Sequence, residues 1–159
     1  MKHFFTLLAL TIGFSMNAQV SYDETEASGG FSTAIGYRTT ASGFASTATG
    51  EDTEASGNYS TAMGSETEAS GYASTSIGQY NVINSGDSAT TFAATNTAFS
   101  IGNGTTNALR SDAFSIKFNG DTSIAGSIES TSFITKNGTS SQFTKADGSL
   151  DSREFPSLK

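Results

Sequence analysis

The sequence of 159 residues contains no cysteine, a single proline and a single histidine. Without cysteine the chain forms no disulfides, so its stability must come from a core, a metal or an oligomer. The histidine, His3, lies at the start of an N-terminal apolar region. The rest of the chain therefore has no Ser-His-Asp or Cys-His nucleophilic site and no His or thiolate metal site. Because only carboxylates, Lys and Tyr remain for acid–base chemistry, we expect no catalytic residues, no metal, no cofactor and no enzyme activity.

Long hydrophobic runs are also scarce. The extended one, Phe4 to Phe14, follows Lys2 and precedes Met16 and Ala18, which are placed like the small residues before a cleavage site. This pattern predicts a signal peptide over residues 1–19, cleaved after residue 18 or 19. The alternatives are a buried N-terminal helix and an uncleaved anchor. Because a membrane span needs ~20 apolar residues, we expect a secreted or surface protein with no direct membrane span.

Basic residues are nearly missing from the first half of the chain. Between Gln19 and Tyr80 the only base is Arg38. The acids in this stretch are Asp23, Glu24, Glu26, Glu51, Asp52, Glu54, Glu66 and Glu68. The formal net charge of the whole chain is -7. Since nucleic acid and anionic lipid would repel such a surface, we expect no nucleic acid partner.

Glycine, by contrast, is frequent, and it returns at every seventh position. The series is Gly36, Gly43, Gly50, Gly57, Gly64, Gly71 and Gly78. The underlying pattern, S-G-x-x-S-T-A-x-G-x-x-T-x-A, has a period of fourteen and occupies residues 28–41, 42–55, 56–69 and, with a divergent end, 70–83. A fixed short period is typical of a solenoid, whose units pack only on their neighbours. The Gly, Ser and Thr content disfavours helix; a flexible linker is the alternative, but a linker needs no phase.

Each repeat predicts two short strands and two tight turns. The seven glycines are expected to be structural turn residues, because glycine permits positive φ and close backbone approach. Strand residues alternate sides, so Ser32 and Ala34 share one side while Thr33 and Ile35 share the other. We expect the Thr33/Ile35 side to pack inward and the small Ser/Ala/Gly side to let chains approach closely.

The second strand of each repeat is expected to divide in the same way. One side carries Thr39, Thr53 and Thr67 with Ala41, Ala55 and Ala69. The other side carries Thr40, Glu54 and Glu68, which must face water. The repeats offer mainly Ala, Ile, Met and a few aromatics, which is little apolar surface for one chain to bury. This shortage predicts additional burial between chains.

The segments "STAIG", "STAMG" and "STSIG", each followed by two variable residues, resemble the head repeat of trimeric autotransporter adhesins, the YadA-like heads. The resemblance covers about residues 28–83. It implies an all-β fold, a left-handed parallel β-roll, in a homotrimer at the bacterial cell surface in association with the outer membrane. It also implies adhesion to host matrix, cells or a substratum through an extracellular matrix or cell-surface protein ligand. One departure is the column Thr33, Thr47, Thr61 and Thr75, where the family often has Val.

The remaining sequence changes phase. The segment "AFSIGNGTTNALRSDAFSIKFNGD" (98–121) resembles segments that close such heads and segments of phage tail-fibre tips. We expect domains at 20–83 (β-roll repeats), 84–120 (head-closing β segment) and 121–159 (short strands and a loose tail). In the closing segment, "AFSIKFNGD" predicts a strand with Phe114, Ile116 and Phe118 on one side and a hairpin turn at Asn119-Gly120. Further turns are expected at residues 137–138 and 147–148.

The same residues bear on several other functions. Acidic turns such as Glu51-Asp52 suggest calcium, but calcium needs six to eight converging oxygens, so we expect solvated acids. Thr columns suggest ice binding, which the inward packing of Thr33 and Ile35 would exclude. A polysaccharide lyase would need longer coils. The alternative to the adhesin head is a structural or fibre-tip protein that binds through its C-terminal third.

Aromatic residues fall at the edges of the predicted coils. They are Phe31, Tyr37, Phe44, Tyr59, Tyr72 and Tyr80. Exposed aromatics at such edges can contact a ligand, but packing over the next coil is the expected role. The Arg110-Ser111-Asp112 triplet is expected to pair or cap locally.

Overall fold

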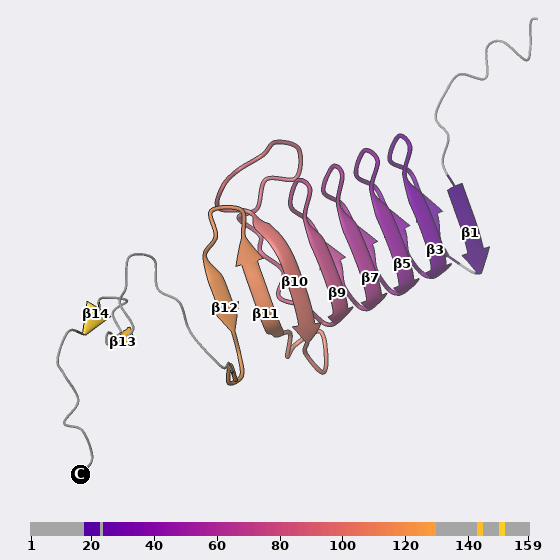
Figure 1. The fold of residues 1–159 in the computed structure, drawn as a ribbon. Coiled ribbons are helices and arrows are strands. Elements are labelled where there is room, and N and C mark those ends of the chain that lie inside the picture. Colours follow the sequence, from indigo (N-terminus) through magenta and orange to yellow (C-terminus); the bar gives the residue numbers. More distant parts are fainter. Residues whose placement is uncertain (1–17, 23, 130–142, 145–149, 152–159) are drawn as a thin grey trace, which may run out of the picture. The chain divides into compact units, whose positions relative to one another are not determined.

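The computed structural model describes residues 18–22, 24–129, 143–144 and 150–151. Every described element is a strand (Figure 1). The chain divides into two compact units, Met1–Gly126 and Ser127–Lys159. The signal peptide predicted over residues 1–19 lies almost wholly outside the described residues. The described ranges include no helix with the length and hydropathy of a membrane span.

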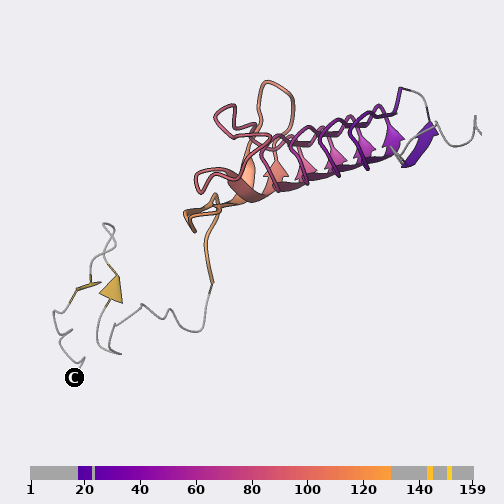
Figure 2. The same ribbon diagram turned by 90° about the horizontal axis from the view of Figure 1, so that it is seen from above.

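The first unit is a β-solenoid with a fourteen-residue period. Its long strands are β1 (Ala18–Tyr22), β3 (Thr33–Tyr37), β5 (Thr47–Glu51), β7 (Thr61–Ser65) and β9 (Thr75–Gln79). Its short strands are β2 (Glu26–Ala27), β4 (Thr40–Ala41), β6 (Glu54–Ala55) and β8 (Glu68–Ala69). Long and short strands form two separate parallel ladders, and each coil contributes one strand to each (Figure 2). The predicted coil of two strands and two turns is confirmed.

The long-strand ladder extends beyond the repeats recognised in the sequence. At one end β1 pairs in parallel with β3, with Ala18 opposite Thr33. At the other end β10 (Thr97–Asn103) pairs in parallel with β9, with Phe99 opposite Thr75. The coil that leads into β10 is longer than the others and carries the loop at residues 84–96. The glycine period misses both additions because neither keeps the fourteen-residue spacing.

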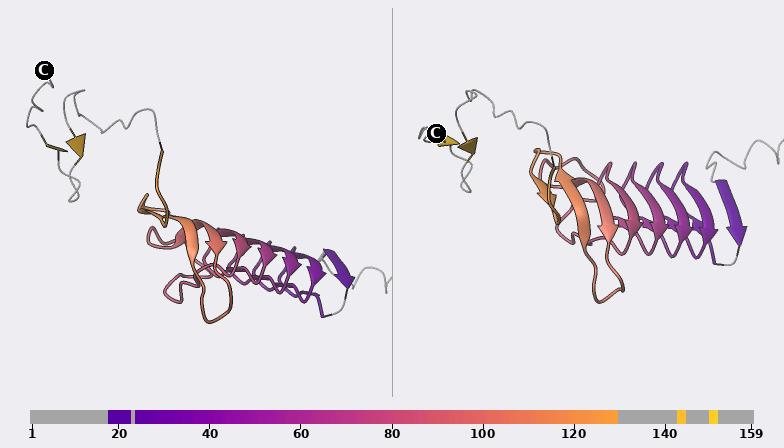
Figure 3. Two further views of the ribbon diagram at one scale, coloured as in Figure 1. Left: turned by 90° about the horizontal axis from the view of Figure 1, so that it is seen from below. Right: turned by 60° about the horizontal axis from the view of Figure 1, so that its bottom comes forward.

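An antiparallel pair closes the long-strand ladder. Strand β11 (Asp112–Lys117) runs antiparallel to β10, and β12 (Thr122–Ile124) runs antiparallel to β11 (Figure 3). The turn predicted at Asn119-Gly120 joins β11 to β12, and Gly120 has a φ of 92°. Within this unit the sheet order is β1-β3-β5-β7-β9-β10-β11-β12.

The interior of the solenoid is filled by small side chains only. In the described chain the buried hydrophobic residues are all alanine: Ala27, Ala34, Ala41, Ala48, Ala55, Ala62 and Ala69. Serine and threonine fill the remaining interior columns, including Ser32 and Thr39, both 0% exposed. The predicted faces of the short strands are confirmed, because Thr39 and Ala41 are buried while Glu54 is exposed.

The predicted faces of the long strands are wrong. Ala34 is 0% exposed whereas Ile35 is 39% exposed, so the Ser/Ala side is the core and the Thr33/Ile35 side faces outward. The physical reason is the width of the coil. Two ladders joined by tight turns leave no room between them for Ile or Met, and the larger side chains must project outside. The small face therefore packs within one chain and does not serve contact between chains.

The periodic glycines occupy two different settings. Gly36, Gly50, Gly64 and Gly78 lie inside the long strands, each as the fourth residue, with φ between 96° and 132°. Gly43, Gly57 and Gly71 lie where the chain bends toward the next long strand, and their φ is not in the left-handed region. Both kinds sit against the neighbouring coil: a Cβ on Gly50 would lie 1.9 Å from the Gly64 carbonyl oxygen, and one on Gly57 2.1 Å from that of Gly71.

Left-handed backbone at the corners is carried by other residues. They are Glu24, Phe31, Arg38, Ala45, Asp52, Tyr59, Glu66, Ala73 and Tyr80, with φ between 44° and 61°. These positions also recur every seventh residue, two per coil. From Ala45 onward, the N–H of each of these residues donates to a backbone carbonyl at the same corner of the preceding coil. For example, the Tyr59 N–H donates to the Phe44 carbonyl at 2.7 Å. At the corners, positive φ is therefore supplied by these residues, whereas Gly43, Gly57 and Gly71 supply the close approach to the neighbouring coil or loop.

The second unit contains one described pair of strands. Strands β13 (Phe143–Thr144) and β14 (Leu150–Asp151) are antiparallel. The turns expected at residues 137–138 and 147–148 lie outside the described residues.

Candidate interaction surfaces

The outer face of the long-strand sheet carries an apolar row. Backbone register aligns Ile35, Thr49, Met63, Ile77, Ile101, Phe114 and Ile124 across successive strands. Beside it runs a second row of Thr33, Thr47, Thr61, Thr75, Phe99 and Ile116. Ile35, Met63 and Ile124 are 39%, 49% and 40% exposed. This face presents large apolar side chains that one chain leaves in water.

The threonine row faces outward, as an ice-binding surface would require. Its neighbouring row, however, is not threonine throughout. Only the coil of β5, through Thr47 and Thr49, places threonine in both rows. Each of the other coils places Ile, Met or Phe in at least one row. A face of mixed aliphatic and aromatic residues suits contact with apolar protein surface better than contact with an ice lattice.

The corners that leave the long strands are charged. Arg38 pairs with Asp52, and its guanidinium lies 5.4 Å from the centre of the Tyr37 ring. Arg110 reaches across to the Glu66 carboxylate at 3.7 Å and donates to the Glu66 carbonyl at 2.9 Å. The bases at this edge are thus held by acids and carbonyls of the coils. Arg110 was expected to pair locally, and its guanidinium does donate to Asn107 Oδ1. Its contacts with Glu66 also tie the closing segment to the coils.

Two carboxylates lie next to each other on the short strands. Glu54 and Glu68 are register partners on β6 and β8. Burial raises the pKa of Glu68, and the neighbouring Glu54 carboxylate raises it further, while Arg110 opposes the change. A pKa that is raised on folding means that this site stabilises the native state at low pH, and the stabilisation is lost as pH rises through the raised value.

We therefore expect Glu68→Gln to stabilise the protein at pH 7. The substitution removes a partly desolvated charge beside Glu54, and the gain in free energy of unfolding should be at most about 1 kcal/mol, because solvent screens the site. Below pH ~4, where the carboxyl is protonated in both states, the gain should vanish. Melting temperatures at the two pH values test this, with the exposed Glu26→Gln as control. A loss of stability at pH 7 would contradict the assignment.

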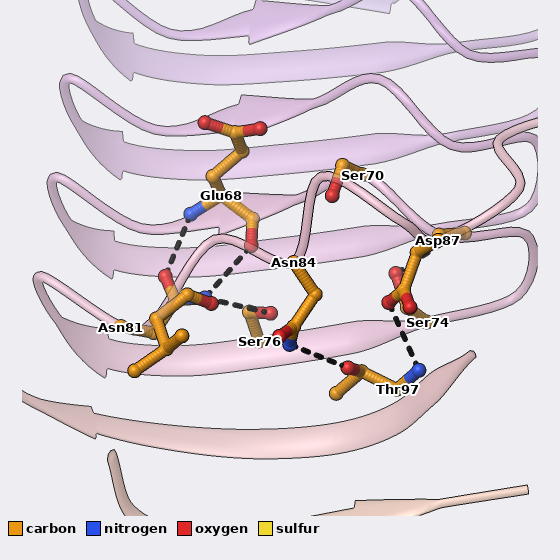
Figure 4. A pocket seen from close by; sticks show the side chains of 10 residues that line it. Glu68, Ser70, Ser74, Ser76, Asn81, Asn84, Asp87 and Thr97 are labelled. Carbon is orange, nitrogen blue, oxygen red and sulfur yellow. Dashed lines mark hydrogen bonds between the residues drawn. The ribbon is translucent and has the colours of Figure 1, made fainter. Parts of the chain in front are cut away.

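A small polar cavity lies where the short-strand ladder ends (Figure 4). Its volume is about 10 Å³, the room of about one water molecule. Its lining consists of Glu68, Ser70, Gly71, Ser74, Ser76, Asn81, Val82, Asn84, Asp87 and Thr97. Asp87 accepts the Thr97 N–H at 2.9 Å, and Asn84 donates to the Thr97 hydroxyl at 2.8 Å. The polar groups are mostly engaged with each other, so the cavity fits a structural role and no substrate.

Asn81 terminates the short-strand ladder. Its Oδ1 accepts the Glu68 N–H at 2.8 Å and its Nδ2 donates to the Glu68 carbonyl at 2.9 Å, as a following strand would (Figure 4). Asn96 makes the same pair of bonds with the backbone of Ser88. Sequence reasoning missed both residues. For Asn81 a signal existed, because it occupies the position of Thr39, Thr53 and Thr67 in the fourth repeat.

The corners that lead into the long strands are aromatic. Phe31, Phe44, Tyr59 and Tyr72 form one row along the solenoid, with ring centres 5.5, 5.6 and 5.4 Å apart. The rings meet edge to face, at interplanar angles of 81°, 76° and 72°. The predicted packing of aromatics over the next coil is confirmed here. Phe31, Phe44 and Tyr59 nevertheless keep 54%, 41% and 50% of their surface exposed.

The described part of the chain contains no group of three or more His, Cys, Asp or Glu residues that could hold a metal ion. Asp112 is engaged differently, because its Oδ1 accepts the Val82 N–H at 2.9 Å. Burial raises the pKa of Asp112, and the bond from Val82 opposes the change. This carboxylate anchors the closing strand to the last repeat.

Comparison with known proteins identifies the repeats. Residues 27–81 match the family model described as the YadA head domain repeat (2 copies), in overlapping placements at residues 27–53, 41–67 and 55–81. Each placement is shifted from the last by one repeat, so the match follows the same coils that the structure contains. No curated protein and no solved structure matches the chain.

Proposed function

We propose that this chain, whose residues 27–81 match the YadA head repeat, is the head module of a trimeric adhesin-like protein at the bacterial cell surface. The family match supports a role in adhesion rather than catalysis. The proposed ligand is a protein of the extracellular matrix, of a cell surface or of a colonised substratum. The mature chain would begin after a signal peptide at residues 1–19 and act outside the cell.

The observation that supports a trimer is that the core holds only small apolar side chains while the outer sheet face exposes large ones. In the described chain the buried hydrophobic residues are all alanine, while Ile35 and Met63 lie outside at 39% and 49% exposure. Apolar area removed from water contributes ~25 cal/mol per Å², and an alanine core removes little. Three copies packed by their outer faces around a common axis would bury the apolar row that each copy leaves exposed.

The acids of the coils bear on the choice of ligand. Glu51 and Glu66 lie where the chain leaves the long strands, and Glu54 lies on the short strand β6. The formal net charge of the chain is -7. Such a surface favours basic or neutral protein ligands, and its long-range attraction weakens within a Debye length of ~10 Å at 0.1 M salt. Three chains acting together would raise the apparent affinity through multivalency.

The adhesion test compares the full chain with a chain that ends at Gly126, the boundary of the first unit. This boundary is chosen because a cut at residue 84 would separate β10 from its partner β9. Both proteins are applied to collagen, fibronectin and intact cells at low and high salt. Equal adhesion by both, weaker at high salt, is the expected result. Adhesion by neither protein would contradict the adhesin proposal.

The alternative function is a structural or fibre-tip protein that binds through its C-terminal third. What favours it is the separate compact unit Ser127–Lys159, which includes the β13–β14 pair. In the same experiment this alternative predicts adhesion by the full chain alone.

A further inference from the structure

The aromatic row at Phe31, Phe44, Tyr59 and Tyr72 has a feature that packing alone does not require. Its rings alternate between two positions of the repeat: "SGGF", "SGFA", "SGNY" and "SGYA" place the aromatic fourth, third, fourth and third. When it is fourth, it adopts left-handed backbone itself, with φ of 61° at both Phe31 and Tyr59. When it is third, Ala45 or Ala73 takes the left-handed position. The alternation produces the edge-to-face contacts.

These contacts separate the rings into two sets. Neighbouring rings stand at 72° to 81° to each other, so they cannot offer parallel faces to one flat ligand. Phe31 and Tyr59, two coils apart, occupy the same position of the repeat with the same φ of 61°. At 54% and 50% they are more exposed than Phe44 at 41%. Two coils correspond to ~9.6 Å along the solenoid, which is close to the length of a disaccharide unit in an extended β-linked glycan.

The corner segments of the row are polar and carry no charge of their own, and Asp87 of the following loop lies beside the last of them, at Gly71. The corner segments 28–31, 42–45, 56–59 and 70–73 contain no Asp, Glu, Lys or Arg. Each contributes one serine, namely Ser28, Ser42, Ser56 and Ser70, and none of these is buried. The Asn58 Oδ1 accepts the Phe44 N–H at 3.0 Å, while its Nδ2 donates to no acceptor among the described residues. Hydroxyl and amide groups thus accompany the rings on the same corner.

The row also has a defined end. The loop at residues 84–96 folds against the last two corners, where the Asn58 N–H donates to the Ala89 carbonyl at 2.8 Å and the Tyr72 N–H donates to the Ser88 carbonyl at 2.7 Å. The corner at residues 56–59 thus bonds the loop in addition to the next coil, where the Ala73 N–H donates to the Asn58 carbonyl at 2.8 Å. The exposed part of the row therefore runs from Phe31 to Tyr59, and a ligand along it meets the loop beyond.

We propose that this aromatic corner binds a neutral polysaccharide chain that lies along the solenoid axis, with the C–H faces of alternate sugar rings stacked on Phe31 and Tyr59. Exposed aromatic rings offer large apolar contact at low entropic cost, and the equatorial hydroxyls of the sugar would bond the serine row and Asn58. The absence of charge at this corner favours a neutral glycan over an anionic one, which the net negative chain would repel. A regular solenoid presenting one corner per coil suits a ligand that is itself a repeating polymer.

The inference adds a ligand class to the proposed adhesin function, and it rests on that function only for its biological setting. Glycan binding would use the aromatic corner, whereas association of chains would use the outer sheet face. Either proposal can therefore be wrong while the other holds. Loss of glycan binding would leave the trimer and any adhesion to protein unaffected.

The test is binding of the full chain to insoluble cellulose, insoluble chitin and a soluble mixed-linkage β-glucan, with alginate as an anionic control. Depletion assays and affinity electrophoresis give the dissociation constants. Tyr59→Ala should weaken binding to the best neutral glycan roughly tenfold, and Tyr59→Phe should retain it because the stacking face remains. Tyr37→Ala is the matched control, since Tyr37 is 39% exposed on the opposite, charged corner. Circular dichroism verifies that each variant folds.

Binding to a neutral glycan that Tyr59→Ala weakens and Tyr37→Ala leaves unchanged would support the proposal. Binding that persists at high salt would support it as well, because stacking is not screened. No binding to the neutral glycans, equal binding to alginate, or equal losses for the Tyr59 and Tyr37 variants would overturn it. If Tyr59→Ala instead reduces adhesion to collagen or fibronectin without any glycan binding, the corner is a protein site and the proposal is wrong.

Discussion

Replacing Gly50 with alanine is expected to lower the free energy of unfolding by about 4 kcal/mol or more. Two effects act together at this residue. Its φ of 131° is a conformation that side chains rarely allow, and a Cβ would lie 1.9 Å from the carbonyl oxygen of Gly64. Neither coil can move aside, because both are held in the same parallel ladder. Chemical denaturation followed by far-ultraviolet circular dichroism measures the change.

Two further glycine variants isolate these effects. Gly86→Ala is the control, because no atom lies within 4 Å of its Cβ position and its φ is not left-handed. Gly57→Ala has the contact, at 2.1 Å from the Gly71 oxygen, without the left-handed backbone. We expect destabilisation in the order Gly50, Gly57, Gly86, with the last near zero. Equal midpoints for the Gly50 and Gly86 variants would show that close approach of the coils does not limit the fold.

The solenoid itself was predictable because its signals are local and repeated. The fourteen-residue period fixed the coil, and the Thr67-Glu68-Ala69 alternation correctly placed Thr67 and Ala69 inside. In the long strands the same reasoning failed. Alternation separates Thr61 and Met63 from Ala62 but does not say which side is inside, and hydrophobicity favoured Met63. The deciding quantity is the width of the coil, which depends on how both ladders and both corners close together.

The candidate surfaces were predictable only in part. The position of Asn81 in a threonine column marks an irregularity, but its two bonds to Glu68 depend on the side chain reaching the neighbouring coil. The aromatic row was expected at the coil edges. Its edge-to-face order was not, because it follows from left-handed backbone at Phe31 and Tyr59, a conformation that sequence patterns assign to glycine first. Contacts between coils, rather than residues within one coil, define these surfaces.

The unsubstituted chain after residue 19 should sediment as a trimer, and Met63→Asp should convert it to monomers. Met63 lies near the middle of the apolar row, between Thr49 and Ile77 in register, and at 49% exposure it makes no contribution to the buried core. In a trimer built on this face, three aspartates would be brought together near the axis and removed from water. An unpaired buried charge costs several kcal/mol, which exceeds what the remaining contacts of a small interface supply.

The matched control for this experiment is Leu109→Asp, which adds the same charge to a side chain that is 66% exposed in the loop between β10 and β11. It should remain trimeric. Sedimentation velocity at micromolar concentration distinguishes the species, and far-ultraviolet circular dichroism shows whether the coils persist after dissociation. Because the Met63 side chain projects outside the coil, the β signal should survive at low temperature but melt earlier than in the trimer, since the alanine core alone then holds the two ladders together. A folded monomer of the unsubstituted chain, or a trimer that tolerates Met63→Asp, would contradict association through this face.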